Sequence, residues 1–345
     1  MSLDVLRDRL RELDRVVVAF SGGADSAFLA YVANETLGDR SLAVTAVSPS
    51  LAPEEEADCR ELAEEWGLRW TPVFTDELAN PAYAMNDGDR CYHCKSELLD
   101  VVAPLADGAT VVLGVNVDDL GDHRPGQRAA EERGAVFPLV DVGITKSDVR
   151  AMSRQLGLRT WDKPAAACLA SRVPYGTEVT VSVLGRIERA EAALHRLGLP
   201  AVRVRHYGDT ARIEVPLDDL PAVLDQREAV VAAVRRAGYG YVTLDLEGLR
   251  SGNLNRALTV TDTQPPGRAE GSLPNRSSRR RRHEGSGPGG PSVGIAGQAG
   301  LSGGSRGRAR RTRASARKTP AASSRPSPFT SAWMTRPTDL AQMWS

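Results

Sequence analysis

Residues 15–26 read RVVVAFSGGADS, an apolar run followed directly by a Gly-Gly turn and a polar stretch. Arg15–Phe20 has the composition of a buried strand, and Ser26–Ala33 predicts a helix that begins just after the turn. The two glycines let the backbone turn tightly, so that successive N–H groups and the helix N-terminus face one anion, and the two serines add hydroxyl donors. We interpret the stretch as a phosphate cradle, with a plain strand-to-helix turn as the alternative. Its candidate binding residues are Ser21, Gly22, Gly23, Asp25 and Ser26.

Strand and helix patterns alternate on both sides of this stretch. This alternation is typical of a parallel sheet covered by helices. We therefore predict a doubly wound α/β domain over residues 1–160. Further strands are expected at Leu42–Val47, Arg69–Phe74 and Val111–Val115, and helices at Pro53–Trp66, Cys94–Leu105 and Lys146–Leu156.

The pattern changes after the loop at Asp162–Gly176. An amphipathic helix, a two-stranded hairpin, a helical stretch and a last strand follow one another, an order that suggests a small α+β domain. We assign residues 161–257 to this domain, together with the loop that precedes it. The expected elements are Ser182–Leu197, Val202–His206, Arg212–Val215, Leu217–Ala237 and Tyr241–Leu246.

The composition is that of an ordinary globular protein, with 345 residues, 41% hydrophobic and 26% charged. It excludes a collagenous, a membrane-embedded or a wholly disordered protein. No apolar run approaches the roughly 18 residues that span a bilayer, and the first residues are charged. We therefore predict a cytoplasmic protein. A reducing cytoplasm would keep its four cysteines from forming structural disulfides, which leaves metal, redox or nucleophilic use as the question for each of them.

The net charge of zero combines two unlike parts, because residues 1–250 carry −12 and residues 251–345 carry +12. The second part contains 13 Gly, 9 Pro and 14 Ser among its 95 residues. This composition predicts disorder, and we assign residues 258–345 to a disordered tail. The arginine-rich tail resembles translation of GC-rich DNA in a shifted frame. A nucleic-acid-binding arm is the functional alternative.

The cradle lacks the Gly-Lys-Ser/Thr ending of a Walker loop. Its S-G-G-x-D-S pattern resembles the PP-loop of the ATP pyrophosphatases, which have an adenine nucleotide alpha hydrolase-like fold and cleave ATP between the α and β phosphates. The resemblance implies transfer of AMP to an acceptor oxygen, after which a nitrogen or sulfur nucleophile displaces the AMP. In such a site Asp25 is a candidate ligand of Mg²⁺, and helix capping is its alternative role.

Three cysteines have a spacing that suits a soft metal. Cys91 and Cys94 form a C-x-x-C pair and Cys168 is a distant third, so that a [4Fe-4S] cluster held by three thiolates would keep one iron open. Structural zinc is the rival and needs His93 or Cys59 as a fourth ligand. A bare redox pair is a further alternative, although the usual thioredoxin pattern is absent. We interpret Cys59 as an ordinary, partly buried residue.

Four segments together resemble the LarE family, the ATP-dependent sulfur transferases of nickel-pincer nucleotide synthesis. The resemblance covers roughly residues 1–257. It implies that the substrate is pyridinium-3,5-biscarboxylate mononucleotide, whose carboxylates are adenylylated and become thiocarboxylates for the cofactor of lactate racemase. The segments are Cys91–Lys95, Gly114–Gly126, the loop around Cys168, and Arg250–Asn255.

The family implies two sulfur sources. In one type the loop cysteine, here Cys168, attacks the adenylate and is left as dehydroalanine after C–S cleavage. In the other type three cysteines, here Cys91, Cys94 and Cys168, hold a [4Fe-4S] cluster that carries a transferable sulfide. Because all three are present, we favour the cluster and keep the sacrificial route as the alternative.

Several basic residues are candidates for phosphate binding. Arg203 and Arg205 lie two apart on a strand and share a face, and Arg212 is expected on the neighbouring strand. Such a set of guanidinium groups suits the phosphate of a nucleotide substrate, with a solvated strand face as the alternative. Lys146 and Arg172 are candidates for the ATP phosphates, and each has a surface charge as its alternative role.

Two other functions compete with the sulfur transferase. A PP-loop transfer-RNA thiolase is one, although the acidic body at −12 would repel RNA and no nucleic-acid partner is expected for it. A nucleotide-binding module without catalysis, with the basic tail as its working part, is the other. The oligomeric state is left open by the sequence, with a homo-oligomer among the expectations.

Overall fold

The computed structural model describes residues 3–121, 125–164 and 167–250. Every described residue lies in one compact unit, Met1–Pro266. The predicted disordered tail, residues 258–345, lies outside the described residues, as does most of the family segment Arg250–Asn255. The division expected after residue 160 stays a prediction.

The first sheet is parallel throughout and has the strand order β3-β2-β1-β4. Its strands are mostly buried, as expected for a sheet with helices on both faces. The chain runs outward from β1 to β2 and β3 and then returns to place β4 on the other side of β1. The strands are β1 (Val16–Ala19), β2 (Ser41–Val47), β3 (Trp70–Phe74) and β4 (Thr110–Leu113).

Helices cover both faces of this sheet. Val16 and Val18 of β1 belong to a core with residues of α1, α2, α3 and α8, whereas Leu113 of β4 packs with residues of α5 and α6. The doubly wound α/β prediction is therefore confirmed. The helices are α1 (Leu3–Leu13), α2 (Ala24–Leu37), α3 (Pro53–Trp66), α4 (Pro81–Ala84), α5 (Arg90–Ala106), α6 (Pro125–Glu132), α7 (Pro138–Asp141) and α8 (Lys146–Gln155). None of the helices that the structure describes is long and apolar enough to span a membrane.

The start of α5 differs from the expectation. The sequence predicts a start at Cys94, but the helix begins at Arg90, so that both cysteines of the C-x-x-C pair lie near its N-terminus, Cys91 in the first turn and Cys94 just after it. The turn before it explains the earlier start, because Asp87 accepts hydrogen bonds from the backbone N–H groups of Asp89 and Arg90. By contrast, α3 has the predicted bounds, with Pro53 at its N-terminus and Gly67 in the left-handed conformation at its end.

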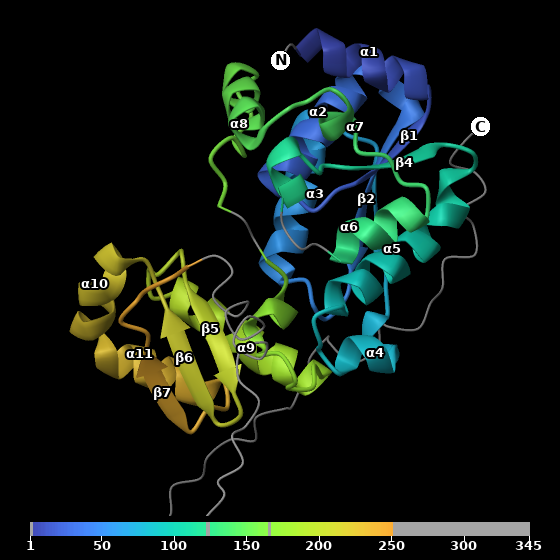
Figure 1. Cartoon of the computed structure of the whole chain (residues 1–345). Coiled ribbons are helices and arrows are strands. Elements are labelled where there is room, and N and C mark those ends of the chain that lie inside the picture. The colour runs from blue at the N-terminus through green and yellow to red at the C-terminus, as the bar shows by residue number, and fades with distance from the viewer. Residues whose placement is uncertain (1–2, 122–124, 165–166, 251–345) are drawn as a thin grey trace, which may run out of the picture. The chain divides into compact units, whose positions relative to one another are not determined.

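The remaining elements form a second, smaller sheet with its own helices, as predicted for an α+β domain (Figure 1). In this sheet β5 and β6 are antiparallel, and β7 is parallel to β6. Helices α9 and α11 pack on its apolar side. The helical stretch expected at Leu217–Ala237 is divided near Gln226, where the backbone leaves the helical conformation. The elements are α9 (Val181–His195), β5 (Arg203–Tyr207), β6 (Thr210–Glu214), α10 (Leu220–Asp225), α11 (Arg227–Arg236) and β7 (Tyr241–Leu244).

Candidate active site

The predicted phosphate cradle is the turn between β1 and α2. Gly23 is the N-cap of α2, and the two serine hydroxyl groups, Ser21 Oγ and Ser26 Oγ, lie 3.0 Å apart. Ser26 Oγ also donates to the carbonyl oxygen of Gly23 at 3.2 Å. The first N–H groups of a helix have no partner within the helix, so this turn offers donors to a phosphate. It lies where the strand order reverses, the usual place for a ligand in such sheets.

Two glycines are required by close packing around the cradle. Gly22 has a φ of +69°, and a methyl group on it would lie 2.9 Å from the sulfur of Cys59. A methyl group on Gly114, just after β4, would lie 2.7 Å from the backbone nitrogen of Ser26. Cys59 is fully buried in α3, and burial raises the pKa of its thiol to about 11. It therefore supports the cradle from below as an unreactive packing residue.

Asp25, in the first turn of α2, is held by a residue that follows β4. The side-chain amide of Asn116 donates to Asp25 Oδ1 at 3.1 Å, and the backbone N–H of Asn116 donates to Asp119 Oδ2 at 3.2 Å. Burial raises the pKa of Asp25 and the charge of Asp119 adds to the rise, while Lys146 and Asn116 oppose it. Two carboxylates that repel each other in a partly buried site suit a divalent cation such as Mg²⁺.

Lys146 begins α8 near the same carboxylates. Its backbone N–H donates to Asp118 Oδ2 at 2.7 Å, and Thr145 caps the helix. The positive charge of Lys146 opposes the rise in the pKa of Asp25. The structure thus brings Lys146 to the cradle, where the sequence placed it as a ligand of the ATP phosphates.

The loop that carries Cys168 is fixed to the same edge of the first sheet. The backbone N–H of Leu169 donates to the carbonyl of Ser50 at 2.8 Å, just after β2. Arg90, at the start of α5, donates to the carbonyl of Ala170 at 2.9 Å. Cys168 itself is exposed. These bonds hold an accessible thiol beside the first turn of α5.

The three predicted sulfur ligands lie on neighbouring segments, the N-terminal part of α5 and the loop that Arg90 contacts. Cys91 and Cys94 lie three residues apart in a helix and so share a face, and Cys94 packs against the apolar cluster that contains Leu169 and Ala170. Burial raises the pKa of Cys94 to about 12, and the nearby charge of Cys168 contributes. Among the described residues no group of three or more His, Cys, Asp or Glu side chains is already arranged as a metal site.

A buried cation lies beside these cysteines. Arg90 is only 5% exposed and donates to Asn86 Oδ1 as well as to the Cys168 loop. Burial alone would lower the pKa of Arg90. The nearby Cys168 and Cys91 raise it, and the pKa of Arg90 lies above its ordinary value as a net result. A cation at this place would offset part of the negative charge that thiolate ligands bring to a cluster. The donor set therefore fits an iron–sulfur cluster.

Arg172 holds the Cys168 loop from the other side. Its guanidinium donates to both carboxylate oxygens of Glu191 in α9, at 2.9 and 3.0 Å, and to the carbonyl of Cys168 at 3.2 Å. The residue is 8% exposed. Arg172 was predicted to bind the ATP phosphates; that role stays a prediction, and the contacts show a residue that positions the loop.

The three arginines of the second sheet differ in their surroundings. Arg205 is 3% exposed and pairs with the fully buried Glu214, and it lies opposite Arg212 as predicted. Arg212 also contacts Glu214, at 2.9 Å. Arg203 is half-buried; burial and the charges of Arg172 and Arg205 lower its pKa. An accumulation of positive charge around Arg203 suits an anion, as the phosphate-binding prediction requires.

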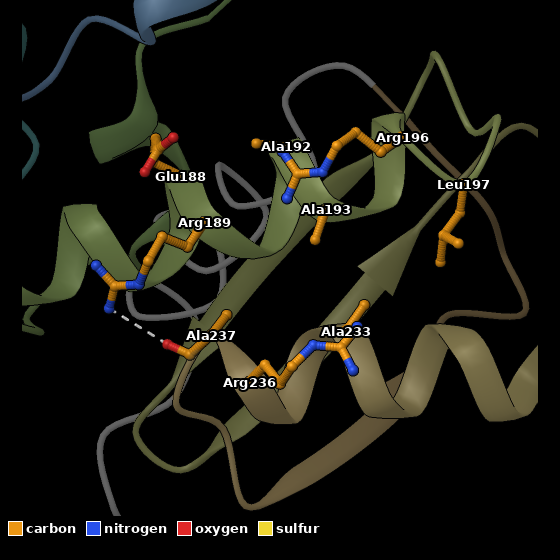
Figure 2. Close-up of a pocket in the computed structure, with 9 residues that line it drawn as sticks. All are labelled: Glu188, Arg189, Ala192, Ala193, Arg196, Leu197, Ala233, Arg236 and Ala237. Carbon is orange, nitrogen blue, oxygen red and sulfur yellow. Dashed lines mark hydrogen bonds between the residues drawn. The ribbon is translucent and has the colours of Figure 1, made fainter. Parts of the chain in front are cut away.

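A surface cavity lies elsewhere, between α9 and α11 (Figure 2). It has a volume of about 360 Å³, and Arg189 beside it donates to the carbonyl of Ala237 at 3.3 Å. None of the candidate site residues lines it. The lining residues are Glu188, Arg189, Ala192, Ala193, Arg196, Leu197, Ala233, Arg236 and Ala237.

Comparisons with known proteins agree with this geometry. Residues 2–91 match the NAD synthase family. The chain is 40% identical over 256 residues to the pyridinium-3,5-bisthiocarboxylic acid mononucleotide synthase of Lactiplantibacillus plantarum, covering 72% of this chain and 92% of the relative. The chain belongs to the LarE family. It is therefore an ATP-dependent sulfur transferase of the PP-loop type.

Two further relatives cover most of the same region. An uncharacterized protein of Synechocystis is 49% identical over 262 residues, which is 74% of this chain and 98% of the relative. A glutamine-hydrolyzing GMP synthase component of Thermoplasma acidophilum is 25% identical over 288 residues, or 76% of this chain and 86% of the relative.

Sequence reasoning missed Asn86, which connects the turn before α5 to the segment that follows Cys168. Asn86 is fully buried with a φ of +56°, and its side-chain amide donates to the carbonyls of Pro174 and Thr177 at 2.8 and 2.9 Å. It also accepts from Arg90. The Asn-Asp-Gly run at residues 86–88 predicts a turn, since Asn tolerates the left-handed conformation. No sequence pattern predicts that the side chain of Asn86 is buried.

Proposed function

We propose that this LarE-family chain converts the carboxylates of pyridinium-3,5-biscarboxylic acid mononucleotide to thiocarboxylates, giving the ligand of the nickel-pincer cofactor of lactate racemase. The observation that carries the proposal is the match to the Lactiplantibacillus plantarum synthase, which covers 92% of that enzyme. The site geometry supports it, because an ATP-binding loop and an accessible Cys168 lie at one edge of the same sheet.

The first half of the reaction is activation of a carboxylate. The N–H groups of the cradle and Lys146 bind the phosphates of ATP, so that a carboxylate oxygen of the substrate attacks the α-phosphorus. The bond from that phosphorus to the bridging oxygen breaks, and pyrophosphate leaves with the electron pair. Asp25, oriented by Asn116, is the residue that would hold Mg²⁺. When bound, Mg²⁺ neutralises the charge of the phosphates.

The second half is delivery of sulfur to the adenylate. Cys91, Cys94 and Cys168 would hold a [4Fe-4S] cluster, and Arg90 would offset the charge of their thiolates. When bound by three cysteines, such a cluster supplies an open iron that can carry a transferable sulfide. The contacts of the Cys168 loop with Ser50 and Arg90 keep the third thiol close to α5.

A sacrificial route remains the alternative for the sulfur. In that route Cys168 Sγ attacks the carbonyl carbon of the adenylate and AMP leaves. Loss of the Cα proton and cleavage of the Cβ–Sγ bond then leave dehydroalanine on the chain and the sulfur on the product. The exposed position of Cys168 is compatible with this role.

Arg203, with Arg205 and Arg212 beside it, is proposed to bind the phosphate of the nucleotide substrate. The lowered pKa of Arg203 supports this, because burial and two neighbouring guanidinium groups disfavour its charge unless an anion is bound. Glu214 holds the guanidinium groups of Arg205 and Arg212 in a fixed orientation, and these two residues would contribute to phosphate binding mainly through that orientation.

The activation step is tested with the purified chain, ATP and the pyridinium mononucleotide. We expect AMP and pyrophosphate to form, and Asp25→Ala to abolish this while the protein stays folded. Formation of ADP would contradict the proposal. If pyrophosphate release depended on transfer RNA instead, the chain would be a transfer-RNA thiolase, and with neither acceptor active it would be a nucleotide-binding module.

The sulfur source is tested by anaerobic purification followed by iron and sulfide analysis. The cluster proposal predicts about four irons per chain, lost together with sulfur transfer when Cys91, Cys94 or Cys168 is replaced by Ser. Cys59→Ala is the matched control and should keep the iron. If only Cys168→Ser is inactive and the spent chain has lost the mass of H₂S, the sacrificial route is correct. A colourless zinc protein would contradict the cluster.

A further inference from the structure

Lys163 connects the segment that leads to Cys168 with helix α3. Its backbone N–H donates to the carbonyl of Thr160 at 3.1 Å. Its ammonium group donates to Asp58 Oδ2 at 2.6 Å and to Glu55 Oε2 at 2.8 Å. The side chain is only 19% exposed. The charge is thus held on α3, although the backbone of Lys163 belongs to a different part of the fold.

The same ammonium group lies beside the phosphate cradle. A methyl group on Gly22 would lie 3.8 Å from Lys163 Nζ. An ammonium group has three N–H donors, and only two of them have partners among the described residues. The third donor is therefore available to a ligand next to the turn that binds phosphate.

The two carboxylates explain why a cation is needed here. Glu55 and Asp58 carry negative charge close to a loop that must bind a polyphosphate, and uncompensated they would repel it. Arg159 also pairs with Asp58, at 2.7 Å, but its side chain is 43% exposed and it is not among the atoms closest to Gly22. Lys163 is thus the cation of this group that lies nearest to the cradle.

We propose that Lys163 binds the pyrophosphate portion of ATP in the PP-loop and thereby links occupancy of the nucleotide site to the segment that carries Cys168. Glu55 and Asp58 hold the ammonium group in place beside the loop. The proposal rests on the use of ATP by this chain and is independent of the identity of the acceptor.

The chemistry of the first step gives this contact a purpose. As the α-phosphorus is attacked, the bridging oxygen departs with the electron pair and negative charge grows on pyrophosphate. A fixed ammonium group stabilises that charge without transferring a proton. Because Lys163 is five residues before Cys168 in the chain, the same contact restrains the base of the loop that acts next.

The test measures binding of pyrophosphate, ATP and AMP to the full chain by calorimetry. For Lys163→Met we expect binding of pyrophosphate and of ATP to weaken by about 10- to 100-fold, the range for one lost charged hydrogen bond. AMP, which lacks the β and γ phosphates, should bind as before. Lys163→Arg should keep most of the affinity. Arg159→Met is the matched control and should bind all three ligands like the wild type.

A second variant separates a contact from a purely neutralising role. In the triple variant Glu55→Gln, Asp58→Asn, Lys163→Met the carboxylates are gone as well, and we expect pyrophosphate binding to stay at least about tenfold weaker than in the wild type. Full recovery would overturn the proposal, because Lys163 would then only offset the carboxylates. Unchanged pyrophosphate binding in Lys163→Met, or equal weakening of AMP, would overturn it too.

Hydrogen exchange provides the readout for the link to the loop. Pyrophosphate should slow amide exchange in residues 158–164 of the wild type and leave it unchanged in Lys163→Met. If both proteins were protected equally, the link between nucleotide and loop would be refuted.

Discussion

Replacement of Glu214 by Gln tests the buried charges of the second sheet. Glu214 is fully buried and accepts from Arg205 Nε at 2.9 Å and from Arg212 Nη2 at 2.9 Å. The substitution keeps the size of the side chain but leaves Arg205, which is 3% exposed, without its counter-charge. Breaking a buried ion pair by removal of one partner costs about 3–5 kcal/mol, which is the expected loss in the free energy of unfolding.

This loss corresponds to a large thermal shift. At about 2–4 °C per kcal/mol for a chain of this size, Tm should fall by roughly 6–20 °C. The measurements are thermal and urea unfolding of the full chain. Glu228→Gln is the matched control and should have no measurable effect on the free energy of unfolding. Both side chains of the Arg227–Glu228 pair are exposed, by 70% and 88%.

The result that would refute the reasoning is a Glu214→Gln protein within about 1 kcal/mol of the wild type, the range of an ordinary neutral hydrogen bond. The neutral amide would then satisfy both guanidinium groups as well as the carboxylate does. The charge of Glu214 would have no role in keeping Arg205 buried.

Two further predictions concern single residues. In ligand titrations, Arg203→Lys should weaken binding of the pyridinium mononucleotide by about 1.5–3 kcal/mol per lost charged hydrogen bond, because Lys cannot reproduce the planar fork of a guanidinium group. Binding of ATP should stay unchanged. Equal weakening of both ligands would contradict the prediction. The pKa of Cys59 is raised from 9.0 to about 11 in the folded chain. Between these two pH values the thiol ionises in the unfolded chain but stays protonated in the folded chain. The free energy of unfolding should therefore fall by about 1.4 kcal/mol per pH unit from this group as the pH rises. Urea unfolding should show this slope in the wild type relative to Cys59→Ala, and parallel pH profiles would refute it.

The first sheet could be predicted from the sequence because its signals are local. Each of these signals reflects a backbone or solvent preference of a few residues. Examples are the apolar run Val16–Ala19, which is buried on both faces of the sheet, the Pro at the start of α3 and the Gly at its end. The division of Leu217–Ala237 into α10 and α11 could not be predicted, because Gln226, where the backbone leaves the helical conformation, has no strong preference against a helix.

The candidate site was predictable where a motif acts through its own backbone, as the cradle of Ser21–Ser26 does. It was less predictable where a partner distant in sequence decides a residue's role. Arg203 and Arg205 are equivalent by strand alternation, yet Arg205 is buried against Glu214 whereas Arg203 is only half-buried. The pairing register does not explain the difference, because it places Arg203 directly opposite Glu214. The guanidinium group of Arg205 instead reaches Glu214 diagonally and also donates to the carbonyl of Ser171, a partner distant in sequence.

The parallel arrangement of the first sheet brings two chemical steps to one edge. The cradle follows β1, Asn116 follows β4, and Ser50, which binds the Cys168 loop, follows β2. All three therefore lie at the carboxyl ends of neighbouring parallel strands. The adenylate that we propose to form at the cradle would thus be made at the sheet edge that also anchors the Cys168 loop, and one bound intermediate would meet the proposed sulfur donor without release into water.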